Sequence, residues 1–128
     1  MAHGGASREE TLIHRLVYTG RLPRPQKGGE HWVYRYRLKR AALKTFGVLP
    51  VPATQKALIT LTRVLGPKQR PYDVENFAYQ QKGLVDALKA GRYLVDDSPK
   101  WVTISYIQDE RNRAQGPCIL IDIRYTEE

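Results

Sequence analysis

The chain has 128 residues, of which 41% are hydrophobic and 27% charged, and it contains one cysteine. This length accommodates one domain with its own core, and one cysteine excludes an internal disulfide. No apolar run approaches the ~20 residues of a membrane helix, and the N-terminus has no apolar signal core. We therefore expect a cytoplasmic protein without membrane contact, with a flexible tail over residues 1–10 and one domain over residues 11–128.

The charge of the chain points toward a polyanionic partner. Its formal net charge is +8, from 21 Lys and Arg against 13 Asp and Glu. A basic surface of this kind favours nucleic acid. Charge alone leaves nucleic-acid binding and the absence of any specific partner equally open.

A strand followed by a basic loop is expected at the start of the domain. Residues 11–19 are rich in β-branched and aromatic residues, which is typical of a strand. Residues 21–30 contain two prolines and a Gly-Gly pair and form a loop that carries Arg21, Arg24 and Lys27. This loop is either a solvated connector or an arm that lies along a phosphate backbone.

The next segments alternate between helical and extended patterns. Residues 30–46 place apolar side chains on one helical face, and Gly47 is a plausible C-terminal stop. The basic residues of this helix scatter around it, so a recognition helix is not indicated. Residues 56–65 alternate as a strand.

Two further strands are expected near the C-terminus. Residues 101–108 and 118–125 alternate in the same way, and the polar segment 109–117 separates them. We interpret these two strands as an antiparallel hairpin. The order strand, helix, strand, helix, strand, strand predicts a single α+β domain, with a mixed or antiparallel sheet of about four strands and two helices.

An acidic stretch with helical character lies between the second and third predicted strands. Asp73 and Glu75 stand at the start of a predicted helix that ends at Gly91, and Asp96-Asp97 follow after a short apolar step. On a helical wheel, Glu75, Lys82 and Asp86 share one polar face, while Leu84, Val85 and Leu88 lie on the apolar face. Lys82 and Asp86 are also an i,i+4 pair.

Two interpretations of these acidic residues stay open. One is a solvated helix face with a carboxylate that caps the helix. The other is a metal site, because the adjacent Asp96 and Asp97 repel each other and a cation relieves that repulsion most directly. Carboxylate oxygens suit Mg²⁺ or Mn²⁺. A metal ion held by acids on a basic surface suits phosphodiester hydrolysis, with a nearby lysine to stabilise developing negative charge.

The same stretch resembles the RusA family of Holliday junction resolvases, small endodeoxyribonucleases common in phage and prophage genomes. The family pattern is D-x-D-N-x-x-K, then D-A-L, then an apolar step into D-D. The matching residues here are Asp73, Glu75, Asn76, Lys82, Asp86-Ala87-Leu88 and Asp96-Asp97. Glu75 stands where the family usually has Asp. Relative to the pattern, three residues are inserted between Asn76 and Asp86, so Tyr79 occupies the usual lysine position.

The resemblance implies a homodimer that cuts four-way DNA junctions with Mg²⁺ (Mn²⁺ possible) and without a small-molecule cofactor. Asp73, Glu75 and Asp97 would be the metal-binding catalytic acids, with Asp96 adjacent and Lys82 as the catalytic lysine. For the displaced lysine three alternatives remain: Lys82 reaches back, a bulge or later helix start absorbs the insertion, or a lysine such as Lys68 or Lys100 substitutes.

Basic residues that flank the acidic stretch are expected to contact DNA phosphates together with the loop arginines. These residues are Lys68, Arg70 and Lys100. The alternative function is a non-catalytic protein that retains the fold and binds DNA junctions or single strands. A third, weaker alternative is a basic RNA- or ribosome-associated protein whose acidic residues are structural.

Overall fold

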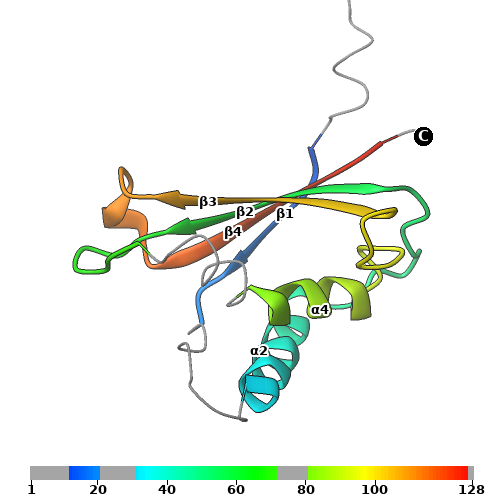
Figure 1. Ribbon diagram of the computed structural model, residues 1–128, viewed down its shortest axis with the longest axis horizontal. Helices are drawn as coiled ribbons and strands as arrows, with labels where there is room; N and C mark the ends of the chain where they lie inside the picture. The colour runs from blue at the N-terminus through cyan, green and yellow to red at the C-terminus, as the bar shows by residue number, and fades with distance from the viewer. Residues whose placement is uncertain (1–11, 21–30, 72–80, 127–128) are drawn as a thin grey trace, which may run out of the picture.

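Four strands and two helices make up the part of the chain that the computed structural model describes, which is residues 12–20, 31–71 and 81–126. In chain order they are β1 (Leu12–Tyr18), α2 (His31–Phe46), β2 (Ala57–Val64), α4 (Lys82–Ala90), β3 (Val102–Asp109), the short 3-10 helix η1 (Arg113–Gln115) and β4 (Cys118–Tyr125). The strands form one mixed sheet with both helices on the same face (Figure 1). The predicted α+β class and element order are confirmed.

The strand order differs from the sequence-based prediction at the C-terminus. The sheet has the order β1-β4-β2-β3, in which β4 is antiparallel to β1 and β2, whereas β2 and β3 are parallel. The predicted β3–β4 hairpin is therefore wrong, because β2 lies between the two strands. Residues 110–117 connect the edge of the sheet to an interior position instead of forming a hairpin loop.

The burial of each strand explains this order. Ile119, Ile121 and Ile123 of β4 are almost completely buried, which suits a strand with a neighbour on each side. In β3 the outward-facing Thr103 and Ser105 are exposed and polar, as expected of an edge strand. A parallel pair needs a crossover connection, and α4 lies on the crossover between β2 and β3.

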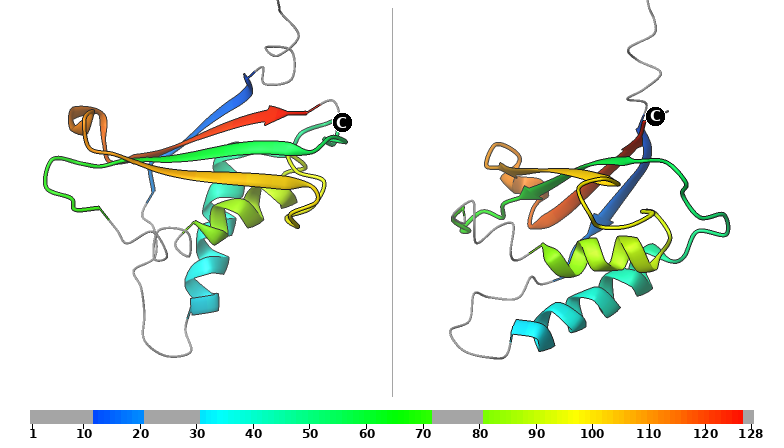
Figure 2. Two further views of the ribbon diagram at one scale, coloured as in Figure 1. Left: turned by 45° about the horizontal axis from the view of Figure 1, so that its top comes forward. Right: turned by 45° about the vertical axis from the view of Figure 1, so that its right-hand side comes forward.

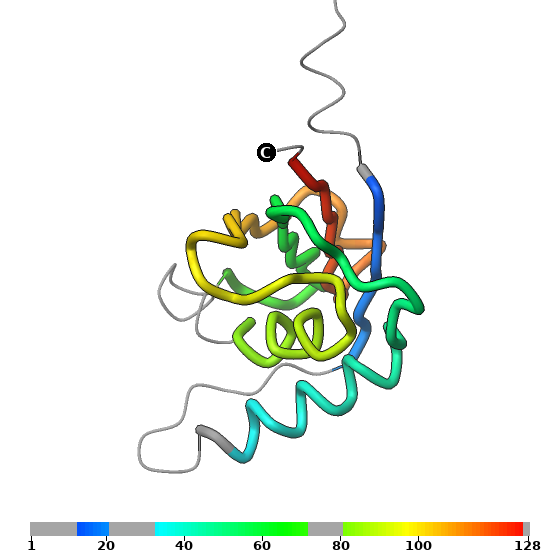
Figure 3. Tube along the Cα trace, turned by 90° about the vertical axis from the view of Figure 1, so that its right-hand side faces the viewer, coloured from blue at the N-terminus to red at the C-terminus, as the bar shows by residue number. Residues whose placement is uncertain are grey.

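The core lies between the sheet and α4. Alternate residues of β2, among them Ile59 and Leu61, point toward the helices and pack with Leu84 and Leu88 of α4. Each fully buried leucine of this kind contributes about 1.5–3 kcal/mol to stability. In the end-on view α4 lies next to the sheet and α2 packs on the outer side of α4 (Figure 3). No helix in the described residues has the length and apolar character needed to cross a membrane.

The two helices end as predicted. Gly47 follows α2 with a φ of 77°, a conformation that favours glycine, and Gly91 follows α4, where its N–H donates to the carbonyl of Ala87 at 2.8 Å. The helix of the described residues begins at Lys82, so this lysine lies in its first turn. The predicted start of the helix, at Asp73 and Glu75, lies outside the described residues.

A glycine allows α4 to approach α2 closely. A Cβ atom on Gly83 would lie 2.8 Å from the carbonyl oxygen of Arg35 and 2.9 Å from Cβ of Leu38. Both distances are shorter than real Cβ contacts. The absence of a side chain at Gly83 therefore sets the spacing between the two helices.

We expect Gly83→Ala to lower the free energy of unfolding by about 1–3 kcal/mol, because the added methyl group collides with the α2 backbone. This loss would occur although alanine favours helix formation over glycine by about 1 kcal/mol. Urea denaturation followed by circular dichroism measures the change. The control is Ala90→Gly at the exposed end of α4, which should cost no more than about 1 kcal/mol. A stabilised Gly83→Ala variant would contradict the close-packing argument.

Candidate functional site

A cavity of ≈ 200 Å³ is lined by residues of α2, α4, β3 and the loop after α4. Figure 2 shows that both helices lie on one face of the sheet. The residues that line the cavity are Arg35, Lys82, Val85, Asp86, Asp97, Ile104 and Tyr106. The cavity thus combines two cationic and two anionic side chains with an apolar wall. This arrangement suits a ligand that carries negative charge and is bound partly through a cation.

The periodicities of α4 and β3 explain why most of these side chains face the cavity. Lys82, Val85 and Asp86 are at i, i+3 and i+4 on α4, so they share one helical face. Ile104 and Tyr106 are two residues apart on β3 and point to the same side of the sheet. Asp97 comes from the loop after α4. Lys82 and Asp97, both predicted catalytic residues, therefore line one cavity.

An ion pair between the two helices forms part of the cavity. The Arg35 guanidinium donates to both carboxylate oxygens of Asp86, from Nε at 2.5 Å and from Nη2 at 2.8 Å. The i,i+4 spacing suggested Lys82 as a partner of Asp86; the bidentate contact from Arg35 of α2 was not predicted. Sequence reasoning missed Arg35 as a site residue, since its partner is 51 positions away.

Lys89 provides the cation that the adjacent aspartates were expected to require. Its Nζ lies 2.9 Å from Oδ1 of Asp96 and 3.7 Å from Oδ1 of Asp97. The hydrogen bond from Lys89 lowers the pKa of the Asp96 carboxyl, to which the Asp97 backbone N–H also donates. The same pairing raises the pKa of Lys89. The repulsion between the two carboxylates is thus relieved within the protein itself.

The buried Arg63 forms hydrogen bonds to the chain just before the acidic stretch that begins at Asp73. Arg63, at the end of β2, is 5% exposed, and its Nη1 donates at 3.1 Å to both the Arg70 carbonyl and Oε1 of Gln108. Gln108 is the direct neighbour of Arg63 on β3. These contacts hold the chain where it leaves the sheet toward residue 72.

The predicted DNA-binding residues are not all on one side of the molecule. Lys68 and Arg70 are exposed in the segment after β2, whereas Lys100 lies before β3, with its Nζ 5.5 Å from the centroid of the Trp101 ring. Because β2 and β3 are parallel, these positions fall at opposite ends of the two strands. Lys68 and Lys100 are absent from the cavity lining, which contains Lys82.

Several predicted residues lie outside the described part of the chain. They are Asp73 and Glu75 of the acidic stretch and Arg21, Arg24 and Lys27 of the basic loop. Their roles stay predictions. The cavity is therefore defined by Lys82, Asp86 and Asp97, which the sequence singled out, and by Arg35 and Tyr106, which it did not.

The donor atoms near the cavity suit a hard divalent cation. Within the described ranges, no group of three or more His, Cys, Asp or Glu side chains could hold a metal ion. Mg²⁺, however, is commonly bound by one or two carboxylates and several water molecules. Asp96 and Asp97 could supply these carboxylates. The Lys89 ammonium would then have to move away from the oxygen atoms that bind the ion.

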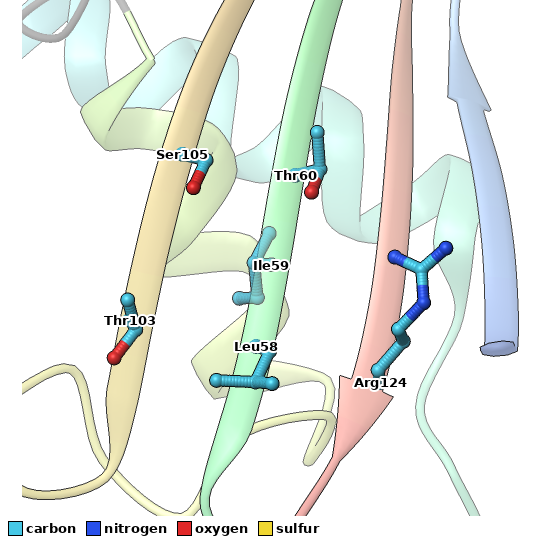
Figure 4. Close-up of a pocket in the computed structure, with 6 residues that line it drawn as sticks. All are labelled: Leu58, Ile59, Thr60, Thr103, Ser105 and Arg124. Atoms are coloured by element: carbon cyan, nitrogen blue, oxygen red, sulfur yellow. The ribbon is translucent and has the colours of Figure 1, made fainter. Parts of the chain in front are cut away.

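A second hollow, of ≈ 540 Å³, lies on the opposite, uncovered face of the sheet (Figure 4). Its lining residues are Leu58, Ile59, Thr60, Thr103, Ser105 and Arg124. The lining contains hydroxyl groups and one guanidinium but no carboxylate, imidazole or thiol. Acid–base or metal-assisted chemistry is therefore better supported by the smaller cavity beside α4, despite the difference in size.

Comparisons with protein-family models gave no match for this chain, and no curated protein matches it significantly. The resemblance to RusA resolvases accordingly stays a prediction. The structure adds one observation in its favour: the motif residues Lys82, Asp86 and Asp97 line the same cavity.

We expect Lys89→Met to raise the pKa of Asp96 toward that of an ordinary aspartate, because the variant removes the hydrogen bond and the positive charge that lower it. In the wild type, the lowered pKa contributes stability above about pH 4, and this contribution is lost as the pH falls through the folded-state pKa. A carboxyl ¹³C NMR titration measures the pKa of Asp96 directly.

Lys100→Met is the matched control for Lys89→Met, since the Lys100 ammonium lies over the Trp101 ring. This control should leave the pKa of Asp96 unchanged. An unchanged Asp96 pKa in Lys89→Met would show that the two side chains are not paired in solution.

Proposed function

We propose that the protein is a Mg²⁺-dependent, structure-selective endodeoxyribonuclease that cuts four-way DNA junctions. One observation carries this proposal: Lys82 and Asp97 line the same cavity although most of α4 and a loop separate them in the chain. Asp86, the aspartate of the Asp-Ala-Leu motif, lines it as well. Lys82 and Asp86 share one face of α4 because of their i,i+4 spacing, whereas helical periodicity does not require Asp97 to line the same cavity.

In this proposal the chain divides the chemistry among a few side chains. Asp97, with Asp96 beside it, holds Mg²⁺, and Asp73 and Glu75 are further ligands. When bound, the ion supplies charge neutralisation at the phosphate and a water of lowered pKa for attack at phosphorus. Lys82 stabilises the negative charge that develops on the phosphate oxygens. The Tyr106 hydroxyl is protonated at neutral pH like that of any tyrosine, and burial raises its pKa further, so it is a hydrogen-bond donor at this site.

The overall charge and the expected oligomeric state belong to the same proposal. A formal charge of +8 attracts the DNA backbone to the protein and makes binding depend on salt concentration. A four-way junction has equivalent strands related by two-fold symmetry, and symmetric cutting needs two sites. The protein therefore acts as a homodimer in this proposal.

A non-catalytic junction binder is the second candidate, and one observation favours it. Lys89 already compensates the charge of Asp96 and Asp97, so these carboxylates have a structural role that needs no metal ion. A protein of this kind would bind junctions through its basic surface and leave the phosphodiester bonds intact.

A labelled synthetic four-way junction separates the two candidates. We expect Mg²⁺-dependent cleavage by the wild type, and a rate at least about 100-fold lower for Asp97→Asn, because the amide removes the negative charge that holds the ion. Junction affinity should stay within a few-fold. Denaturing gels measure cleavage, and gel-shift titration in Ca²⁺ or EDTA measures binding.

The matched control for Asp97→Asn is Glu110→Gln, which removes one carboxylate charge from the exposed connection between β3 and β4. It should cleave like the wild type. Junction binding without cleavage at any Mg²⁺ or Mn²⁺ concentration would favour the binder. Cleavage that survives Asp97→Asn would place the active site elsewhere.

We expect Lys82→Ala to slow cleavage by about 100-fold, because the cavity loses a cation that stabilises the transition state. Single-turnover rates at saturating enzyme separate this effect from binding, which should change by no more than a few-fold. Lys82→Arg retains the charge and should recover part of the rate. A change in affinity alone would mean that Lys82 is only a phosphate contact.

A further inference from the structure

Arg35 brings a second cation to the cavity from an element that contributes no residue to the motif. Among the described basic residues of α2, Arg35 is the one that lines the cavity. Its side chain is 47% exposed, so solvent and solutes reach it, while that of Asp86 is only 20% exposed. The guanidinium is therefore more accessible to a ligand than the carboxylate with which it pairs.

The geometry of the ion pair holds the guanidinium in one orientation. Two donors on one edge, Nε and Nη2, contact the two oxygens of Asp86, and this fixes the plane of the group. Both residues stand on helices whose spacing is set by the close contact at Gly83. A side chain held in this way on rigid elements loses little freedom when it binds a ligand.

A similar ion pair on the other face of the sheet joins two neighbouring strands. Arg15 donates to Asp122 from Nε at 2.7 Å and from Nη2 at 3.1 Å. These two residues are direct partners across β1 and β4, so their pairing stabilises the register of adjacent strands. Arg35 and Asp86 join two helices at the edge of a cavity that also holds Lys82 and Asp97.

The shape of a guanidinium matches a phosphate in a way that an ammonium does not. Its planar fork of N–H groups suits bidentate contact with carboxylate and with phosphate oxygens, whereas lysine acts as a point charge. Asp86 accepts from Nε and Nη2 and so accounts for two of the five N–H groups of the Arg35 guanidinium. The cavity thus offers a planar donor and a point charge to the same anion.

We propose that Arg35 binds the non-bridging oxygens of a DNA phosphodiester in this cavity and that Asp86 is the positioning residue that aims its guanidinium. This inference rests on the proposed function, because it assigns the substrate phosphate to the same cavity. It adds a substrate contact outside the RusA-like motif. It also gives the Asp-Ala-Leu aspartate a role other than metal binding.

A binding experiment tests the phosphate contact without any need for cleavage. The Arg35 Nε–Hε resonance is assigned by its loss in Arg35→Lys and is followed by ¹H–¹⁵N NMR during titration with a short single-stranded oligothymidylate. It should shift with the phosphodiester strand and stay in place with the uncharged methylphosphonate strand of the same sequence. The Arg37 resonance, on the same helix, should shift far less. Equal shifts for Arg35 and Arg37, or none for Arg35, would overturn the inference.

Kinetics on the four-way junction test the same contact during catalysis. Arg35→Gln should lower the single-turnover rate at saturating enzyme by about 10- to 100-fold, and Arg35→Lys should recover only part of it. Arg37→Gln removes the same charge from the same helix at an exposed position and should stay within about threefold of the wild type. Equal effects of Arg35→Gln and Arg37→Gln would contradict a specific phosphate contact, because Arg35 would then contribute only its positive charge.

The positioning role of Asp86 has its own readout. Asp86→Asn should lower the cleavage rate with junction affinity unchanged, and Asp86→Glu, which keeps the carboxylate, should restore part of the rate. Thermal unfolding monitors whether each variant is folded, and the NMR titration of the wild type decides the phosphate contact even if a variant unfolds. A wild type that neither binds nor cuts junctions defeats the proposed function. A cutting wild type with a normal Arg35→Gln variant defeats only the present inference.

Discussion

The contact between α4 and α2 at Gly83 is the constraint on which the rest of the site depends. A side chain larger than hydrogen at this position would push the helices apart, since the α2 backbone lies within 2.8 Å of where a Cβ would stand. At that spacing Arg35 reaches Asp86, and residues of both helices and of β3 line one open cavity. Packing and electrostatics are therefore linked: the close approach of two helices creates the charged cavity.

Paired charges recur through this basic domain, and their surroundings distinguish their roles. The Arg15–Asp122 pair joins neighbouring strands on the uncovered face of the sheet, where it stabilises strand register. The Lys89 ammonium lies between the oxygens of two adjacent aspartates and offsets their repulsion. Exposed pairs of this kind contribute little to stability individually. Their larger effect is to determine where carboxylates point and which of them face a ligand.

The proposed nuclease chemistry follows from the way the crossover between β2 and β3 is built. Because these strands are parallel, the chain must return along the sheet, and it does so through the segment that contains α4. This return places Lys82 at the start of the helix and brings Asp97 back to the same cavity after its end. Arg35 comes from the neighbouring helix. In the proposed function, residues from these three segments act on one phosphate.

Some features of this protein are determined by local sequence alone. Two-residue and 3.6-residue periodicities predict the strands and helices, and Gly47 predicts the end of α2 because its left-handed φ of 77° is costly for other residues. The same local reasoning identifies Lys82 and Asp86 as one face of α4. These inferences hold because each depends on residues that are near neighbours in the chain.

Other features were decided only by the tertiary structure. The alternating patterns of β3 and β4 are compatible with a hairpin, but in the sheet β4 pairs with β1 and β2, so β2 lies between β4 and β3. Periodicity likewise gives no indication that Lys89 neutralises Asp96, since a tight turn separates the two. Arg35 meets Asp86 across 51 positions. Long-range contacts of this kind depend on how whole elements pack, which no local pattern encodes.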